Sequence, residues 1–100
     1  MLVAGDLTLD PATHRVARGD VEVPLSPRQF SLLEYFLRHA GEVLPKSRIL
    51  EHVWDFAFEG DPNIVEVYVR QLRLRVDEPF GRSALQTVRG AGYLLDPDGG

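Results

Sequence analysis

The spacing of the apolar residues changes twice along this chain, and the order of those changes limits the folds it can adopt. In the first part, apolar and polar residues alternate in three short segments, Leu7–Leu9, His14–Ala17 and Val21–Val23. The turn-prone pairs Asp10-Pro11 and Gly19-Asp20 separate these segments. Alternation with a period of two places one side of each strand in the core. We therefore expect a small antiparallel sheet with one buried face over about residues 2–24.

The spacing then changes to that of a helix, which we predict over residues 26–40. Ser26 suits the N-cap, Pro27 the first helical position, and Gln29 completes an S-x-x-Q capping box. The apolar residues that follow recur on one helical face, at Phe30, Leu33, Phe36 and Leu37. Gly41 is a residue type that commonly ends a helix, so we expect the helix to stop there.

Two further helices and a hairpin complete the predicted order. The segments are residues 46–54 for the second helix, 55–61 for a loop, 62–76 for the third helix and 85–95 for the hairpin. Pro45 stands where a capping side chain would help the second helix, whereas Asp61-Pro62 is a favourable start for the third. The hairpin turns at Gly90-Ala91-Gly92, where glycine permits unusual backbone angles. This order of strands, helices and hairpin predicts one α+β domain over residues 1–100.

Charge is distributed unevenly along the chain. The net charge is -4, which by itself argues against a polyanionic partner. Residues 1–62 carry six basic and ten acidic side chains, but residues 63–95 carry five arginines against three acidic groups. A polyanion responds to the local field where it docks, so the total charge leaves nucleic-acid binding open.

The third predicted helix has two different faces. With residues placed at 100° steps, the core stripe collects Val65, Val69, Leu72 and Val76, with Tyr68 beside it. The opposite face collects Asn63, Val67, Arg70, Gln71 and Leu74, with Glu66 and Arg73 on one flank. These residue types can contact base edges in a major groove, but a charged outer face can also be merely solvated.

The hairpin turn favours the DNA-binding interpretation of that face. Arg89 directly precedes the turn and can project from the hairpin tip. An arginine in such a place suits a narrow minor groove. The Gly-Ala-Gly turn is compatible with an ordinary hairpin as well, so it does not decide the question alone.

Four segments resemble the effector domains of OmpR/PhoB-type response regulators. They are Leu25–Leu33 (LSPRQFSLL), Ile49–Trp54 (ILEHVW), Val65–Arg73 (VEVYVRQLR) and Gln86–Tyr93 (QTVRGAGY), in order over nearly the whole chain. The resemblance implies a winged helix-turn-helix fold, with an N-terminal antiparallel four-stranded sheet, three helices and a C-terminal β-hairpin wing. It also implies sequence-specific binding of double-stranded promoter DNA, as a dimer on direct repeats, within a two-component regulatory system.

The same resemblance implies a second partner and a missing domain. In this family the loop corresponding to Asp55–Asp61 is thought to contact RNA polymerase. The phosphorylated receiver domain of such regulators is not present in these 100 residues. No residue here is therefore expected to be the phosphorylation site.

Individual roles also follow from the resemblance. Glu66 and Val67 match positions that face bases, whereas Arg70 and Arg73 match basic positions near bases or backbone. Thr87 matches a wing position that donates to a phosphate, and Arg89 one that reaches the minor groove. Gln71 departs from the arginine that several relatives carry, and glutamine favours adenine over guanine. Pro45 departs from a serine that is common at the start of the second helix, which leaves a backbone contact there in doubt.

Two other classes of function are alternatives to DNA binding. An enzyme is disfavoured because His14, His39 and His52 fall on different elements with no nucleophile motif or ligand pair beside them. A winged helix that contacts only proteins is the second alternative, supported by the acidic total and by Phe56 and Phe58 in the loop, which we otherwise expect to pack on the core. We predict no catalytic residue, no metal ion, no cofactor and no small-molecule substrate.

The composition adds one expectation about location. The chain has no cysteine and no apolar run approaching eighteen residues, so disulfides and a membrane span are not expected. A cytoplasmic location is the corresponding prediction.

Overall fold

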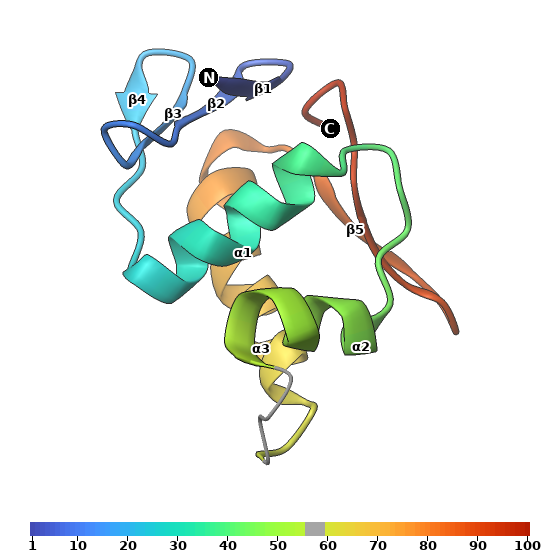
Figure 1. Cartoon of the computed structure of the whole chain (residues 1–100). Helices are drawn as coiled ribbons and strands as arrows, with labels where there is room; N and C mark the ends of the chain where they lie inside the picture. The colour runs from blue at the N-terminus through green and yellow to red at the C-terminus, as the bar shows by residue number, and fades with distance from the viewer. Residues whose placement is uncertain (56–59) are drawn as a thin grey trace.

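The computed structural model describes residues 1–55 and 60–100 and shows a sheet, a group of helices and a hairpin in that order (Figure 1). The strands of the first sheet are β1 (Leu2–Ala4), β2 (Leu7–Asp10), β3 (Arg15–Arg18) and β4 (Val21–Glu22), and the hairpin strands are β5 (Leu85–Val88) and β6 (Gly92–Leu95). Both sheets are antiparallel, and the first has the order β1-β2-β3-β4. The predicted fold class is confirmed.

The helices differ more from the prediction in their ends than in their places. They are α1 (Pro27–Arg38), then α2 (Lys46–Ile49) continued by a π-helical turn η1 (Leu50–Asp55), and α3 (Ile64–Leu72) continued by η2 (Arg73–Asp77) and a 3-10 turn η3 (Glu78–Phe80). No helix in the described part of the chain is both long enough and apolar enough to cross a membrane.

Helix α1 begins as the sequence predicts. Ser26 Oγ accepts from the backbone N–H of Gln29, and Gln29 Oε1 accepts from the backbone N–H of Ser26, which completes the capping box. The predicted apolar face is buried, at Phe30, Leu33, Phe36 and Leu37. The last helical residue is Arg38, two residues before the predicted end, because His39 already leaves the helical conformation.

The start of α3 lies two residues after the predicted one. The Asp61 carboxylate accepts from the backbone N–H of Asn63 in a turn just before the helix, whereas the N-cap of α3 is Asn63, which makes no side-chain capping bond. The backbone N–H of Ile64 bonds to the carbonyl of Asp61, which makes the first turn a tighter i→i+3 turn. The helical path continues past Val76 as far as Gly81, whose φ of 64° ends it.

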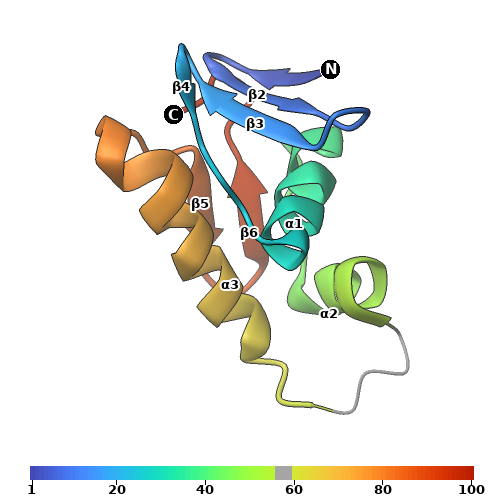
Figure 2. The ribbon, with the colours of Figure 1, turned by 90° about the vertical axis from the view of Figure 1, so that its left-hand side faces the viewer.

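The core lies between the four-stranded sheet, the helices and the hairpin (Figure 2). Leu7, Leu9 and Val16 point into it from β2 and β3, as the alternation predicts. Arg18 occupies the next inward position of β3, opposite Leu7, and its side chain has no exposed surface. A charged residue therefore fills a core position of this sheet.

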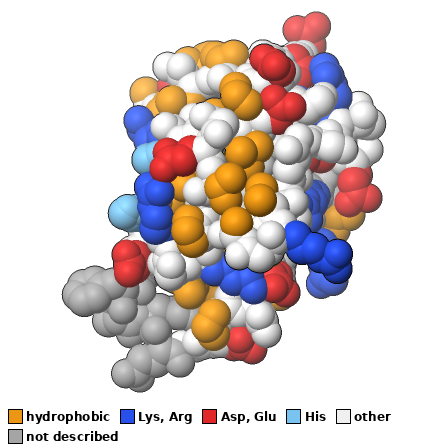
Figure 3. Space-filling model, turned by 90° about the vertical axis from the view of Figure 1, so that its right-hand side faces the viewer, with side chains coloured by type: hydrophobic (Ala, Val, Ile, Leu, Met, Phe, Trp, Pro, Cys, Tyr) orange, Lys and Arg blue, Asp and Glu red, His pale blue; other side chains and the backbone are white. Residues whose placement is uncertain are grey.

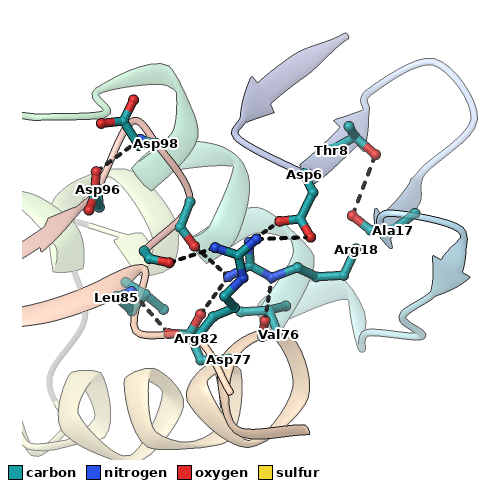
Figure 4. A network of polar contacts seen from close by, with 12 residues as sticks. Asp6, Thr8, Ala17, Arg18, Val76, Asp77, Arg82, Leu85, Asp96 and Asp98 are labelled. Carbon is teal, nitrogen blue, oxygen red and sulfur yellow. Dashed lines mark hydrogen bonds and ion pairs between the residues drawn. The ribbon is translucent and has the colours of Figure 1, made fainter. Parts of the chain in front are cut away.

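Arg18 joins three parts of the chain (Figure 4). Its guanidinium donates to the carboxylates of Asp6 and Asp77, at 2.5 and 3.0 Å, and to the backbone carbonyls of Val76 and Gly99. Asp77 in turn accepts from the backbone N–H of Leu85 at 3.0 Å. The N-terminal sheet, the end of the α3 segment and the start of β5 are thus fixed to one another by a satisfied polar network.

Candidate nucleic-acid interface

Helix α3 lies against the rest of the domain along one side and leaves its other side open (Figure 2). Its inner stripe is fully packed, since Val65, Val69, Leu72 and the following Val76 are at most 1% exposed. Tyr68 is half-buried and its ring packs edge-on against Trp54, with the ring centroids 5.2 Å apart. The predicted helix phase is therefore correct, and Tyr68 is mainly a packed ring.

The open side of α3 carries the exposed members of the predicted site. Asn63, Glu66 and Arg70 are exposed, and Val67 and Leu74 are 37% and 53% exposed. Exposed apolar side chains gain no stability from contact with water. Because Val67 and Leu74 lie between polar neighbours, this face of α3 presents donors, acceptors and apolar groups together.

Three of the predicted site residues are held by neighbouring elements. Glu66 forms an ion pair with Lys46 at the start of α2. Gln71 Oε1 accepts from Gln29 Nε2 on α1 at 3.0 Å. Arg73 donates to the Leu85 carbonyl at 3.0 Å and to Thr87 Oγ1 at 2.7 Å, both on β5. These bonds fix the side chains before any partner is bound.

Arg70 and Arg89 differ from these residues. Both are exposed, and within residues 1–55 and 60–100 neither has a hydrogen bond or an ion pair. An unpaired guanidinium keeps its full capacity for an anionic or acceptor-bearing partner.

The wing is positioned by glycine and by a bridge to the loop before α2. Gly90 has a φ of 76° in the turn after Arg89. The backbones of Leu44 and Tyr93 exchange two hydrogen bonds, of 2.7 and 3.0 Å. At Gly92 an added Cβ would lie 2.1 Å from the Leu44 carbonyl oxygen, so only glycine permits this approach.

A groove of about 380 Å³ separates the wing from the first turn of α3. Its polar lining includes Lys46, Glu66, Thr87, Arg89 and Tyr93. The neighbouring Glu66 carboxylate raises the pKa of the Lys46 ammonium, and burial raises the pKa of the Tyr93 hydroxyl. At neutral pH the groove therefore presents an ammonium and a neutral phenol.

Sequence reasoning missed Lys46 and Gln29 as neighbours of the site. They lie 20 and 42 residues away from the side chains that they contact, and no local pattern signals such pairs. Pro45, by contrast, starts α2 without a side-chain cap, as predicted. In the predicted polymerase loop, residues 56–59 lie outside the described residues, and so does the expected packing of Phe56 and Phe58.

The three histidines lie on different elements, as predicted, but two of them contact the same aromatic ring. His39 and His52 both pack edge-on against Tyr35, each with a centroid distance of 4.8 Å, whereas His14 stacks on Phe30. These are aromatic contacts without a nucleophile. No group of three or more metal-ligand side chains occurs among the residues that the structure describes.

Comparison with known proteins identifies the family. The family model described as "Transcriptional regulatory protein, C terminal" matches residues 20–95. This chain belongs to that family. As a C-terminal domain of this kind, it is 52% identical over 99 residues to the transcriptional regulatory protein TcrA of Mycobacterium tuberculosis and 46% identical over 95 residues to CusR of Escherichia coli. The matches cover 99% and 94% of this chain, but only 39% and 42% of those two proteins.

A solved structure supports the same family membership. The RstA DNA-binding domain of Klebsiella pneumoniae, crystallised in complex with the RstA box, is 30% identical to this domain with a TM-score of 0.84. The match covers 95% of each chain. The predicted OmpR/PhoB-type membership is confirmed, and the family is one of transcriptional regulators and not of enzymes.

Proposed function

We propose that this domain binds double-stranded promoter DNA sequence-specifically and thereby regulates transcription, as the effector part of a response regulator. In this proposal α3 enters the major groove and Arg89 at the wing tip reaches the adjacent minor groove. The resemblance implies that Glu66 and Val67 face bases, that Arg70 and Arg73 lie near bases or backbone, and that Thr87 donates to a phosphate. We assign Asn63 and Gln71 to the same interface because they lie on the predicted outer face of the helix.

The observation that carries the proposal is the pair of unpartnered arginines on two adjacent projecting elements. Arg70 lies on the open side of α3 and Arg89 at the tip of the wing, and neither is paired within the described part of the chain. A helix can enter a major groove while an arginine on an adjacent projecting element enters a minor groove, so these two elements suit one DNA duplex.

Thr87 and Arg73 support a backbone-facing role near the wing. Thr87 Oγ1 accepts from Arg73, so the hydroxyl hydrogen of Thr87 is left to donate outward. A hydroxyl donor beside a guanidinium suits a phosphate oxygen. The RstA domain crystallised with the RstA box, at 30% identity, adds support from a relative.

The wider assembly is also a proposal. This chain spans about two fifths of the length of the curated relatives it matches. We infer that a receiver domain controls it in the complete regulator, that two copies bind direct repeats, and that the segment 55–61 contacts RNA polymerase.

The experiment that tests DNA binding is selection of bound duplexes from a random pool at low salt. The wild-type domain is compared with Arg70→Ala/Arg89→Ala and with a matched control, Arg15→Ala/Arg38→Ala, which removes the same charge from exposed positions of β3 and α1. We expect a short motif that the wild type and the control enrich and that the first variant loses. Equal enrichment by all three proteins would instead contradict the assigned interface.

Failure of every protein to enrich a motif would favour the alternative of a winged helix that contacts only proteins. In that case a capture experiment on the segment 55–61 is the next step. The single domain faces one half-site, so the selection is run with a tethered tandem of two domains as well.

A further inference from the structure

The side chain of Gln29 is fixed at both ends of its amide group. Its Oε1 accepts from the backbone N–H of Ser26 at 3.0 Å in the capping box of α1. Its Nε2 donates to Gln71 Oε1, across to α3, also at 3.0 Å. Gln29 itself is only 9% exposed, so water competes little for these bonds.

The first of these bonds determines which way the amide of Gln29 points. A backbone N–H can only donate, so the atom of Gln29 that faces Ser26 has to be the oxygen. The amino group of Gln29 then faces Gln71. Since an amino group can only donate there, the atom of Gln71 that faces Gln29 has to be its oxygen as well.

The orientation of Gln71 follows from this chain of bonds. Its oxygen is turned toward α1 and its Nε2 is turned away from Gln29. Among the described residues, the one buried side-chain atom without a partner is the Tyr35 hydroxyl, so Gln71 Nε2 is not buried and unpaired. No hydrogen bond is made by this amino group within the same residues, and it is therefore open to a partner.

We propose that Gln29 is a positioning residue that makes Gln71 a donor-only contact in the DNA complex. This inference rests on the proposed function and deepens it. A free glutamine reads adenine by donating to N7 and accepting from N6, which requires both ends of the amide. With its oxygen turned toward Gln29, Gln71 presents its amino group, which recognises acceptors: guanine O6 or N7, adenine N7, thymine O4 or a phosphate oxygen. The adenine preference predicted from the sequence is replaced by a preference for acceptors.

The test is the variant Gln29→Glu, which reverses the polarity of the contact. Glutamate keeps the capping box, since its carboxylate also accepts from Ser26. Its second oxygen then faces Gln71 and requires a donor, so the Gln71 amide rotates and presents its oxygen outward. Ser31→Glu, an exposed position on the same helix, adds the same charge without touching Gln71 and is the matched control.

Duplex selection with the three proteins gives distinct outcomes. If Gln71 contacts a base, Gln29→Glu shifts the contact at one base pair from an acceptor (guanine O6 or N7, adenine N7 or thymine O4) to a donor, which is the amino group of cytosine or adenine, and the selected base changes accordingly. If Gln71 contacts a phosphate, the selected motif is unchanged but affinity falls roughly three- to tenfold, the effect of one lost hydrogen bond. Either result, absent in Ser31→Glu, supports the inference. An unchanged motif with affinity equal to that of Ser31→Glu overturns it.

The free domain provides a reading that does not depend on DNA. In the wild type, one Gln29 side-chain amide proton is expected downfield in the NMR spectrum, and Gln71→Ala removes that shift. In Gln29→Glu the downfield proton moves to Gln71. If the Gln71 amide protons stay at solvent-exposed positions in that variant, the orienting role is wrong even where DNA binding itself is established. If the protons move as expected but no motif is enriched by the wild type, the proposed function fails and the orientation stands.

Discussion

Arg18 shows at the scale of one residue how a charge can occupy the core of a small domain. Its guanidinium is fully buried and is satisfied by two carboxylates and two backbone carbonyls. Removing one partner of a buried ion pair leaves the other charge uncompensated. In this domain that charge belongs to Asp77, which is 2% exposed and holds the start of β5.

The variant Arg18→Met is expected to lose stability although it keeps a long side chain. We expect a loss of about 3–5 kcal/mol in the free energy of unfolding, measured by urea denaturation, because the Asp77 carboxylate remains buried without its cation. Arg15→Ala on the same strand is the control and should change stability by less than about 0.5 kcal/mol, since Arg15 is exposed. A loss of equal size in both variants would mean that the network does not stabilise the fold.

The lowered pKa of Asp6 allows a prediction of how the stability of the fold changes with pH. The hydrogen bond from Arg18 holds the pKa of the Asp6 carboxyl below its ordinary value of 3.8. A carboxyl whose pKa is lower in the folded state stabilises the fold above its unfolded pKa, and this contribution is lost as the pH falls through the folded value. We therefore expect urea stability to decline below about pH 4, and less steeply in Asp6→Asn.

The control for that experiment is Asp20→Asn, at an exposed carboxyl that forms no ion pair within residues 1–55 and 60–100. It should follow the wild-type pH profile. A profile of Asp6→Asn that runs parallel to the wild type would show that Asp6 is not linked to folding.

Single residues were also the level at which sequence reasoning was weakest. Alternation in β3 does not show that Arg18, at the last inward position, is buried, because a buried charge depends on partners supplied by distant segments. In the same way, Gln71 was predicted on the outer face of α3, but it is half-buried and its side chain contacts Gln29 on α1, a residue 42 positions away in the chain. Local patterns contain no information on such pairs.

At the scale of elements, α3 depends on its buried stripe. Leu72 is fully buried, so Leu72→Ala should cost roughly 2–5 kcal/mol of unfolding free energy through the cavity that it leaves. The measurement is the thermal midpoint, with Leu74→Ala as the exposed neighbour that should change it little. A near-neutral result at Leu72 would mean that the inner and outer faces of α3 are wrongly assigned.

The role of the wing in DNA binding can be tested at Arg89. Arg89→Ala should weaken DNA binding and reduce the slope of log affinity against log salt by about one, if Arg89 neutralises a single phosphate. Fluorescence anisotropy at several salt concentrations on the selected duplex measures both quantities. Arg15→Ala should leave them unchanged, and an unaltered slope in Arg89→Ala would remove the wing from the mechanism.

The elements themselves were largely predictable from local chemistry. The capping box at Ser26 and the core stripe of α3 were found because both depend on residues three or four positions apart. The ends of the helices were not: the first turn before Ile64 is a tight i→i+3 turn, and the helical path continues to Phe80, beyond the predicted end.

At the scale of the whole molecule, the net charge of -4 and the proposed DNA partner are compatible because the charge is local. In Figure 3, Lys and Arg side chains are distributed around the periphery of the face shown, whereas its centre is hydrophobic. The N-terminal sheet lies at the opposite end of the domain from the start of α3 (Figure 1). The proposal therefore requires DNA on one side of the molecule only.

The absence of cysteine from the chain permits a direct test of that claim. Single cysteines at the exposed positions Leu74, Ala91 and Val21 place a DNA-cleaving iron chelate beside α3, on the wing tip and on β4. On the selected duplex we predict cleavage within the motif from position 74, cleavage at the flanking minor groove from position 91, and none above background from position 21. Equal cleavage from all three positions, or cleavage from position 21 alone, would contradict the proposed interface.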